Sequence, residues 1–360
     1  MLKFLGRLVG LVLILGLVAA GIFAWGWARY TAPGPLQTET RVVIARGSSV
    51  DQIAQTLSDA GVIEDPMIFK YADWLERTVI APDAAAPLRA GEFAMPAGIS
   101  AREARQQLID GPLVQRRLTV PEGLTTEQIL RLVNEAEGLT GDIETAFDEG
   151  ELLPETYFYE FGDSRESLIQ RMHDDMQAVL AEMWPQRADE LPVESQDEAV
   201  ILASIVQEEA GNVQEMPRVA AVFINRLKRG MRLQADATVE YGITLGTGPL
   251  GRGLLRSELE TLTPYNTYMI DGLPPTPIAN PGREAIEAVL RPAQTDELYF
   301  VADGSGGHAF ARTLEEHERN VQRWRELERE RAQATEQDGQ GEDSGEEAPE
   351  GEGADDGAGN

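Results

Sequence analysis

The sequence predicts an α+β protein with an N-terminal transmembrane helix, a small α+β region, a larger α+β domain and a disordered acidic C-terminal tail. Three observations predict this order. Residues 8–28 contain no charge, residues 38–137 repeat a pattern of strand, turn and capped helix, and residues 336–360 carry acidic side chains without basic ones. The larger domain is expected over residues 138–325, where buried helical patterns alternate with proline-rich loops.

The charge and composition exclude several classes of function. The chain of 360 residues has 61 acidic and 31 basic side chains, a formal net charge of −30, which repels a nucleic-acid backbone. It contains no cysteine and only three histidines, so disulfides and thiol nucleophiles are excluded and a metal site is not expected. We therefore expect no cofactor, no metal and no nucleic-acid partner, and chemistry that rests on carboxylates, hydroxyls and amides.

The N-terminal apolar run is long enough to cross a membrane. Leu8–Ala28 comprises 21 uncharged residues, which as a helix extend about 32 Å, against a hydrocarbon core of about 30 Å. The alternative is a cleaved signal peptide, whose apolar part is shorter and is followed by small residues. Here Trp25 and Trp27 continue the apolar run, and with Tyr30 they are expected to form an aromatic belt at the membrane surface. We therefore expect an uncleaved anchor within residues 1–30.

Basic residues indicate the orientation of this anchor. Lys3 and Arg7 precede the apolar run, although Arg29 follows it, and basic residues are enriched on the cytoplasmic side of membrane helices. The N-terminus is thus predicted to be cytoplasmic and the anchor to lie in the inner membrane, with the rest of the chain outside the cytoplasm. Residues 31–37, which include two prolines and a glycine, are expected to form a short linker.

Three segments within residues 38–137 share one local pattern. In each, an extended stretch and a glycine-containing turn lead to a Ser or Thr followed three residues later by Glu or Gln, a capping box that opens an amphipathic helix. The extended stretches are Thr40–Ala45, Gly91–Met95 and Gln115–Val120, and the capping pairs are Ser49–Gln52, Ser100–Glu103 and Thr125–Gln128. The repeated unit resembles the LysM-like domain of peptidoglycan-binding proteins, which implies carbohydrate binding. The alternative is a set of ordinary capped helices.

The most strongly apolar helix of the larger domain ends in two carboxylates. Ile201–Val206 are apolar or small, which predicts a helix buried on nearly all sides, and Glu208 and Glu209 follow, with Gly211 as the expected C-cap. Burial raises the pKa of a carboxyl group, as a general acid at neutral pH requires. Glu209 stacks on more apolar neighbours than Glu208, because the two point about 100° apart. The alternative is that both lie on the exposed end of a core helix.

Two later segments carry polar and aromatic side chains suited to sugars. Residues 221–241 are expected to be helical through Lys228 and to break at Gly230, after which uncharged polar residues surround Asp236. Residues 263–282 combine tyrosines and asparagines with several prolines. Aromatic faces cover sugar rings, whereas amides and carboxylates pair with hydroxyls. Each segment taken alone could also be a surface loop stiffened by proline.

Five sequence blocks resemble the YceG-like, or MltG, family of endolytic murein transglycosylases. They are LASIVQEEA, VFINRLKRGMRLQADATVEYG, TPYNTY, GLPPTPIANPG and YFVADGSGGHAF, together with a Pro-Glu-Gly turn at Pro121–Gly123. The resemblance implies a single-pass inner-membrane lyase that cleaves the MurNAc–GlcNAc bonds of nascent peptidoglycan strands internally and leaves 1,6-anhydroMurNAc ends. It also implies a role in terminating glycan elongation, with cell-wall synthases as partners.

The resemblance places the catalytic residue on Glu209 and implies a YceG-like catalytic domain over residues 138–325. The candidates for binding the sugars are Gln234, Asp236, Tyr265, Asn266, Tyr268 and Asn280. One catalytic carboxyl group is sufficient for this reaction, because the nucleophile is the muramyl 6-hydroxyl, which is already tethered to the reacting sugar. The alternative is a non-catalytic, membrane-anchored scaffold that binds peptidoglycan for the synthesis machinery.

Two positions near the candidate site depart from the family's pattern. Gln207 stands where the family commonly has a glutamate, which removes that position as a catalytic candidate. Ala237 replaces the proline of an Asp-Pro-Thr motif, a loss of rigidity rather than of a functional group.

The C-terminal region is expected to lose its structure gradually. Residues 313–335 predict a terminal helix that is polar on most faces. Glu336–Asn360 contains ten acidic residues and no basic ones, so it cannot bury enough surface to fold and is expected to be disordered and solvated. Binding of a cationic partner is the alternative role for this tail.

Overall fold

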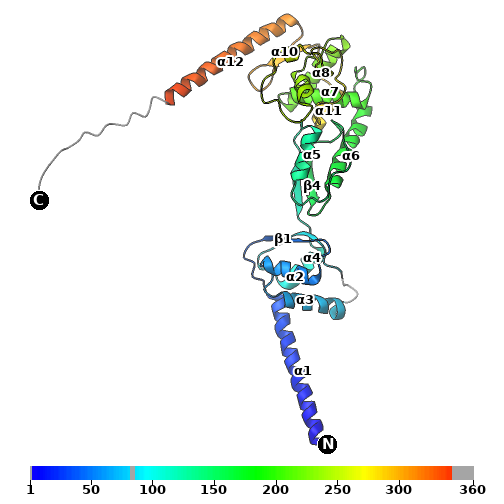
Figure 1. Ribbon diagram of the computed structural model, residues 1–360, viewed down its shortest axis with the longest axis vertical. Coiled ribbons are helices and arrows are strands. Elements are labelled where there is room, and N and C mark those ends of the chain that lie inside the picture. The colour runs from blue at the N-terminus through cyan, green and yellow to red at the C-terminus, as the bar shows by residue number, and fades with distance from the viewer. Residues whose placement is uncertain (1, 82–85, 343–360) are drawn as a thin grey trace, which may run out of the picture. The chain divides into compact units, whose positions relative to one another are not determined.

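The computed structural model describes residues 2–81 and 86–342, which divide into two compact units (Figure 1). Unit 1 consists of Met1–Val120, Ile129–Ala146 and Glu155–Arg171, and unit 2 consists of Pro121–Gln128, Phe147–Pro154 and Met172–Asn360. Helices and short strands occur in both units, so the predicted α+β class is confirmed. The chain passes between the two units several times, and two of these boundaries fall inside helices, at residues 128–129 and 171–172. The predicted domain ranges, which assign functions to segments, stay a prediction.

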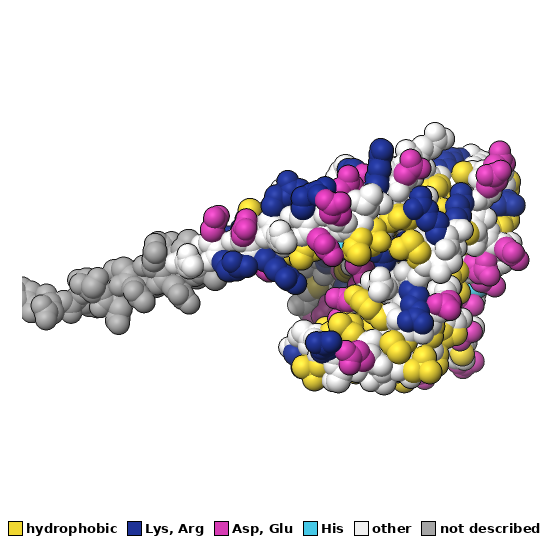
Figure 2. All heavy atoms as spheres, turned by 90° about the horizontal axis from the view of Figure 1, so that it is seen from above, with side chains coloured by type: hydrophobic (Ala, Val, Ile, Leu, Met, Phe, Trp, Pro, Cys, Tyr) yellow, Lys and Arg dark blue, Asp and Glu magenta, His cyan; other side chains and the backbone are white. Residues whose placement is uncertain are grey.

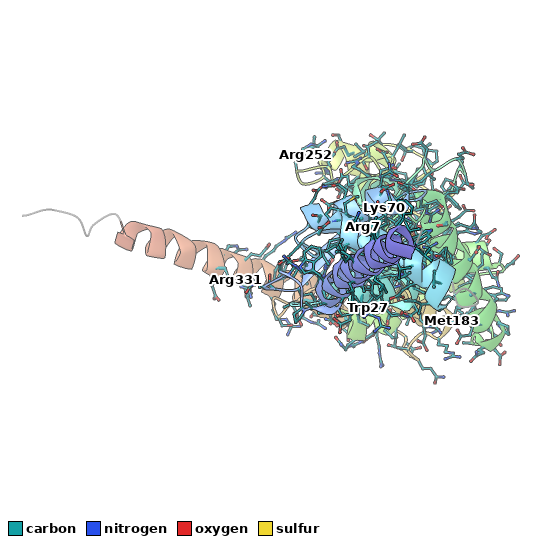
Figure 3. All side chains as sticks on the ribbon, turned by 90° about the horizontal axis from the view of Figure 1, so that it is seen from below. Arg7, Trp27, Lys70, Met183, Arg252 and Arg331 are labelled. Atoms are coloured by element: carbon teal, nitrogen blue, oxygen red, sulfur yellow. The ribbon has the colours of Figure 1, made fainter. Side chains whose placement is uncertain are left out.

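The predicted anchor forms one continuous helix, α1 (Leu2–Thr31), with Arg7 and Trp27 near its two ends (Figure 3). Its stretch Phe4–Thr31 is long and apolar enough to cross a membrane, and an apolar segment of 18 residues within it is not buried inside the protein, as would also hold for a signal sequence. The prediction that Tyr30 belongs to an aromatic belt at the membrane surface is wrong. Tyr30 is fully buried, because the last turn of α1 packs against the folded part of unit 1.

The segment predicted as a linker is held against unit 1. The Gly34 N–H donates to the Gly98 carbonyl oxygen at 3.2 Å, and the Gly98 N–H donates to the Leu36 carbonyl oxygen at 2.9 Å. A Cβ atom on Gly34 would collide with two backbone carbonyl oxygens. The chain therefore passes from α1 into unit 1 along a fixed path.

Unit 1 is built around the predicted strands and capped helices. β1 (Thr40–Ile44) pairs antiparallel with β2 (Gly91–Met95), and both capping boxes, at Ser49 and Ser100, are formed. The helices packed around this sheet are α2 (Val50–Asp59), α3 (Pro66–Leu75), the π-helical turn η1 (Glu76–Ile80) and α4 (Ala101–Asp110). Their shared core includes Leu57, Phe69, Phe93 and Leu108. The sequence analysis did not predict α3, although Asp65 caps it and Pro66 occupies its first turn, a typical helix start.

The third predicted strand pairs with a segment from beyond residue 137. β3 (Gln115–Thr119) lies antiparallel to β4 (Thr156–Glu160), with Gln115 opposite Glu160. Tyr157 and Tyr159 are buried and Phe158 is exposed, the alternation of a half-buried strand. The helix that follows β3, α5 (Thr126–Glu135), begins at the third predicted capping pair. The local pattern therefore predicted each element, but not the partner of β3.

Unit 2 has a helical core with one small hairpin beside it. α7 (Gln196–Glu209), α8 (Met216–Lys228) and α11 (Arg283–Leu290) pack together, and their apolar faces form its largest cluster. The hairpin of β5 (Tyr299–Ala302) and β6 (His308–Ala311) contacts the terminal helix, α12 (Leu314–Glu342). The remaining helices and turns of the chain are α6 (Arg165–Met183), η3 (Trp184–Gln186), η4 (Val213–Glu215), α9 (Asp236–Thr244) and α10 (Arg256–Leu259).

The terminal helix is longer than predicted. α12 (Leu314–Glu342) continues beyond Thr335, and Figure 2 shows acidic and basic side chains mixed along it. Pairs four residues apart support such a helix, as in the 2.7 Å ion pair between Arg319 and Glu315. The predicted start of the disordered tail, Glu336, is therefore wrong, because α12 continues to Glu342. The rest of that prediction, residues 343–360, lies outside the described residues.

Candidate active site

α7 carries the two candidate glutamates to the end of a buried helix. Ser195 caps its start by accepting a backbone N–H, and residues 199–206 are all buried, as predicted from their apolar run. The helix ends after Glu209, because Ala210 adopts an extended conformation with φ −82° and ψ 125°. The C-cap is therefore Ala210, and the prediction of Gly211 as the cap is wrong.

The Glu209 carboxyl group lies in a largely desolvated place beside the first turn of α9. The Ala237 N–H faces this carboxyl group and favours its ionised form. Oε1 is buried and has no hydrogen-bond partner among the described residues. Burial chiefly, and then the negative charge of Asp236, raises the pKa of Glu209 to about 7, against opposing effects of the Ala237 N–H and His308. The carboxyl group can therefore hold a proton near neutral pH and present it from an unoccupied oxygen.

Asp236 is positioned by the loop that contains Tyr268. The Tyr268 hydroxyl donates to Asp236 Oδ1 at 2.6 Å, and burial, followed by this contact, raises the pKa of Tyr268. Beneath them, the Ala235 N–H donates to Thr267 Oγ1 at 3.0 Å, and the hydroxyls of Thr238 and Thr267 lie 2.8 Å apart. These bonds fix the start of α9, and with it Asp236 and the N–H that faces Glu209.

Gln234 occupies a strained position just before α9. Its φ of +53° is in the left-handed region of the backbone map, which residues other than Gly and Asn seldom adopt. Its side chain is exposed, while its backbone N–H donates to the Thr267 carbonyl oxygen at 3.2 Å. Strain of this kind is concentrated at functional sites, because the surrounding structure must hold it in place.

Tyr265 lines a cavity of about 490 Å³ on another side of unit 2. Its hydroxyl lies 2.8 Å from Thr276 Oγ1, and its ring centroid lies 5.0 Å from that of Tyr241. Tyr241 in turn donates to Glu149 Oε2 at 3.3 Å. The cavity therefore combines aromatic faces with a carboxylate, as a sugar-binding surface does.

The structure corrects the prediction for Asn266. Its side chain is fully buried, and its amide donates to three backbone carbonyl oxygens, of Glu258, Leu259 and Thr261, at 2.6–3.1 Å. Its Oδ1 accepts the Tyr268 N–H at 3.0 Å. Because its side chain is fully buried and its amide is hydrogen-bonded within the protein, Asn266 shapes the loop that carries Tyr268 instead of contacting a ligand.

Asn280 is corrected in the same way. It is fully buried; its Oδ1 accepts the Leu152 N–H at 2.9 Å, and its amide donates to Leu124, Thr126 and Glu149 at 3.0–3.1 Å. It therefore joins three segments of unit 2 that are far apart in the sequence. Its predicted contact with sugar does not fit this position.

Glu208 points to a different part of the surface from Glu209, as their angular separation predicted. It lines a cavity of about 270 Å³ with Gly123, Tyr241 and Glu240. Desolvation of its carboxyl group, then the charge of Glu240, raises the pKa of Glu208 to about 7 although the residue as a whole is exposed. A Cβ atom on Gly123, whose φ is +80°, would lie 2.5 Å from Glu208 Oε1. The Pro-Glu-Gly turn thus packs directly against this glutamate.

The sequence analysis missed a histidine–glutamate pair near Glu209. His308 Nδ1 lies 2.9 Å from Glu215 Oε2, and the His308 N–H donates to Glu215 Oε1 at 3.0 Å. The hairpin turn before His308 lies against Gly211, where a Cβ atom would come within 2.6 Å of the Gly306 carbonyl oxygen. His308 stands in the block YFVADGSGGHAF, but 93 residues separate it from Glu215, so no local spacing indicated the pair.

A buried arginine completes the charged surroundings of Glu209. The Arg226 guanidinium donates to the carbonyl oxygens of Leu298 and Leu233 at 2.7 and 2.6 Å and lies 5.3 Å from the centre of the Tyr299 ring. Its charge interacts with Glu209 and Tyr268, and burial lowers its pKa. Within the described residues, no three His, Asp or Glu side chains gather as metal ligands would. The site is therefore built from carboxylates, a phenol, an imidazole and backbone amides.

The comparison with known protein families identifies the family of this chain. The profile of the YceG-like family matches residues 42–323, which include α7, α9, the Tyr268 loop and the β5–β6 hairpin. The chain belongs to the YceG-like family. The resemblance found in the five sequence blocks is thereby confirmed.

Curated relatives of this YceG-like chain carry an activity in their names. Two proteins of Streptococcus pneumoniae, from strains D39 and R6, are each named endolytic murein transglycosylase; each is 29% identical over 330 residues, covering 78% of this chain and 57% of its own length. A Bacillus subtilis protein with the same name is 28% identical over 324 residues, covering 80% of this chain and 85% of its own. The chain thus spans little more than half the length of the streptococcal relatives. A solved YceG-like protein of Listeria monocytogenes is 28% identical, with a TM-score of 0.48 over 78% of this chain and 98% of that one.

Proposed function

We propose that this chain is a membrane-anchored endolytic lytic transglycosylase of peptidoglycan and that Glu209 is its catalytic acid and base. One observation carries the proposal: Glu209 Oε1 is buried, has no partner among the described residues and belongs to a carboxyl group whose pKa is raised to about 7. A buried polar atom without a partner is costly. A substrate oxygen that receives the proton of Glu209 would satisfy it. Membership of the YceG-like family and the names of the relatives support this choice of reaction.

The proposed reaction needs one carboxyl group used twice. Glu209 first donates its proton to the oxygen of the MurNAc–GlcNAc bond, and the bond from that oxygen to C1 of MurNAc breaks as positive charge develops there. The 6-hydroxyl of the same MurNAc then attacks C1, and the Glu209 carboxylate takes the hydroxyl proton. The products are a 1,6-anhydroMurNAc end and a GlcNAc with a free 4-hydroxyl, and no water is consumed. The carboxyl group returns to its protonated form.

The neighbouring residues have separate proposed roles. Asp236 stays close to Glu209 and is held by the Tyr268 hydroxyl, so its negative charge can stabilise the oxocarbenium-like transition state. Gln234 and Tyr268 are proposed to bind the sugars next to the cleaved bond, and Tyr265 to bind a sugar farther along the strand. Asn266 and Asn280 position these loops from inside the protein.

The anchoring and orientation are part of the proposal. α1 is proposed as a single uncleaved span in the inner membrane, with Lys3 and Arg7 on the cytoplasmic side and the chain after α1 outside the cytoplasm. The LysM-like assignment of residues 38–137 is proposed with it, as a region that binds glycan strands. An anchored enzyme would cut nascent strands near their site of synthesis and so terminate their elongation, alongside cell-wall synthases.

The alternative is a scaffold that binds peptidoglycan without cleaving it. The buried, protonatable Glu209 favours the enzyme, because binding of a neutral sugar strand does not require a carboxyl group with a raised pKa. The deciding experiment is digestion of purified sacculi by the full chain in detergent, with mass spectrometry of the released muropeptides. Anhydro ends are expected. Reducing ends instead would mean a hydrolase, and intact sacculi that still bind the protein would favour the scaffold.

A further inference from the structure

α3 and η1 expose an apolar face beside the end of α1. Met67, Tyr71 and Trp74 are 53%, 60% and 58% exposed, and their spacing of four and three residues places them on one side of α3. Val79 and Ile80 continue this face along η1 at 62% and 53% exposure. We call these five residues the α3 apolar face. It lies in the same unit as α1, and α3 contacts α1 directly.

The charged side chains of α3 and η1 form ion pairs within unit 1, including Lys70 beside this face, which pairs with Asp51 of α2 at 2.5 Å. Asp73 is 2% exposed and pairs with Arg105 at 2.8 Å and with Arg77 at 3.0 Å. Glu76 pairs with Arg105 at 2.9 Å. The chain has a net charge of −30, so acidic residues are abundant. Asp73 and Glu76, however, form ion pairs with arginines of unit 1. The acidic side chains of this segment therefore do not cover the α3 apolar face, and Lys70 at its edge is already paired with Asp51.

The α3 apolar face is continuous with the apolar surface of α1. A hollow of about 370 Å³ separates the two helices, and its lining is almost entirely apolar; it includes Phe23, Trp25 and Trp27 of α1 and Ile68, Tyr71 and Leu75 of α3. Basic side chains stand at its margin. The Arg29 guanidinium lies 5.8 Å from the Trp25 ring centre, and that of Arg102 lies 5.9 Å from the Trp27 ring centre. Tryptophan, tyrosine and arginine in this combination are typical of the boundary between lipid tails and headgroups.

We propose that the α3 apolar face lies in the interfacial layer of the membrane that α1 crosses, so that unit 1 rests on the lipid surface outside the cytoplasm. The proposal rests on the anchoring by α1 proposed above. The occupant of the hollow is then lipid, because the hollow opens onto the same apolar surface that α1 presents to the bilayer. A helix buried at this depth fixes the orientation of its unit relative to the membrane.

The absence of cysteine allows a direct test with single spin labels on the full chain. The protein is reconstituted in vesicles of phosphatidylethanolamine and phosphatidylglycerol, and collision rates with oxygen and with a water-soluble nickel complex are measured. One label replaces Tyr71 (Tyr71→Cys). Leu15→Cys in α1 is the control for the bilayer core, and Arg41→Cys, exposed on β1 away from α3 in Figure 1, is the control for water. We expect the oxygen-to-nickel ratio at Tyr71→Cys to lie between those of the two controls.

Each other outcome has a distinct meaning. If the Leu15→Cys label is in the bilayer and Tyr71→Cys matches Arg41→Cys, the docking of α3 is wrong and the anchor stands. If Leu15→Cys also matches Arg41→Cys, the anchor itself is wrong, and the docking with it. Protection of Tyr71→Cys from both reagents would mean a protein contact, such as a second copy of the chain, and would overturn lipid docking. In a Met67→Cys protein, adding Trp74→Glu should shift the ratio toward that of Arg41→Cys.

Discussion

Asp236 lies close enough to Glu209 for its negative charge to raise the pKa of the Glu209 carboxyl group. The Tyr268 hydroxyl, 2.6 Å from Asp236 Oδ1, holds it there. Asp236 acts through its negative charge, whereas the Glu209 carboxyl group can remain protonated near pH 7. This difference separates a group that stabilises positive charge from a group that donates a proton, and the predictions below depend on it.

Replacing Asp236 should change the pH profile of the reaction. In Asp236→Asn the negative charge beside Glu209 is removed, so the pKa of Glu209 falls toward its ordinary value and the acid form is lost at lower pH. We expect the alkaline limb of kcat/KM, which lies near pH 7 in the wild type, to move to lower pH. Asp271→Asn is the matched control, because Asp271 is exposed and pairs with Arg232 instead. An unmoved limb in Asp236→Asn would contradict the electrostatic role of Asp236.

Replacing His308 should move the same limb in the opposite direction. The charge of His308 lowers the pKa of Glu209, so His308→Gln should raise that pKa and extend activity to higher pH. Glu215, 2.9 Å from the imidazole, loses its partner in this variant and its charge would act in the same direction. The check is the kcat/KM profile of the single variant and of the double variant with Asp236→Asn. Opposing shifts should partly cancel in the double variant, and shifts of equal sign would disprove the assignment.

The buried Glu209 should lower stability at high pH. Its pKa of about 7 lies above the ordinary 4.5, so the folded state binds more protons than the unfolded state between these values, and stability falls as pH rises through this window. Glu209→Gln removes that cost. We expect the variant to gain up to about 3 kcal/mol over wild type above pH 7, and little below pH 4. Urea unfolding at several pH values measures the difference; a gain that does not depend on pH would contradict it.

Gln234 and Asn280 should respond differently to substitution. Asn280→Ala leaves the buried Leu152 N–H without its partner, whereas Leu124, Thr126 and Glu149 keep other hydrogen bonds, so it should cost about 1–3 kcal/mol of stability. Gln234→Gly fits the left-handed backbone at φ +53° and should change stability by less than about 1 kcal/mol, while KM for glycan rises if its side chain binds sugar. Unfolding curves and steady-state kinetics of both variants test this. A destabilised Gln234→Gly protein with normal KM would make Gln234 structural.

Local sequence patterns predicted the elements of this fold better than their pairing. The run Ile201–Val206 and the capping box at Ser100 act within one helix, so the structure reproduces both. The pairing of β3 with β4 joins segments up to 45 residues apart, as in the 3.0 Å bond from Gln115 to Glu160. Such a pairing depends on how the intervening chain folds, and no local pattern contains it.

The sequence predicted which kinds of residue form the candidate site better than it predicted what each of them does. The apolar helix made Glu208 and Glu209 candidates, and the family resemblance singled out Glu209. Asn266 and Asn280 carry the same amide that binds sugars, but their burial results from loops that close over them, which their neighbours in sequence do not show. The pair of His308 and Glu215 comes together only when the hairpin folds onto the end of α7.

The most direct test of the central claim compares Glu209→Gln with Glu208→Gln. The two residues are adjacent at the end of α7, and desolvation raises the pKa of both carboxyl groups to about 7 although Glu208 is exposed, so each substitution removes a carboxyl group with a raised pKa. Anhydromuropeptides released from sacculi by each full-length variant are quantified by mass spectrometry. We expect Glu209→Gln to lose about 10²–10⁴-fold in rate, the range of general acid–base catalysis, and Glu208→Gln to retain most of its activity. Release by Glu209→Gln at the wild-type rate would contradict the assignment of Glu209 as the catalytic residue.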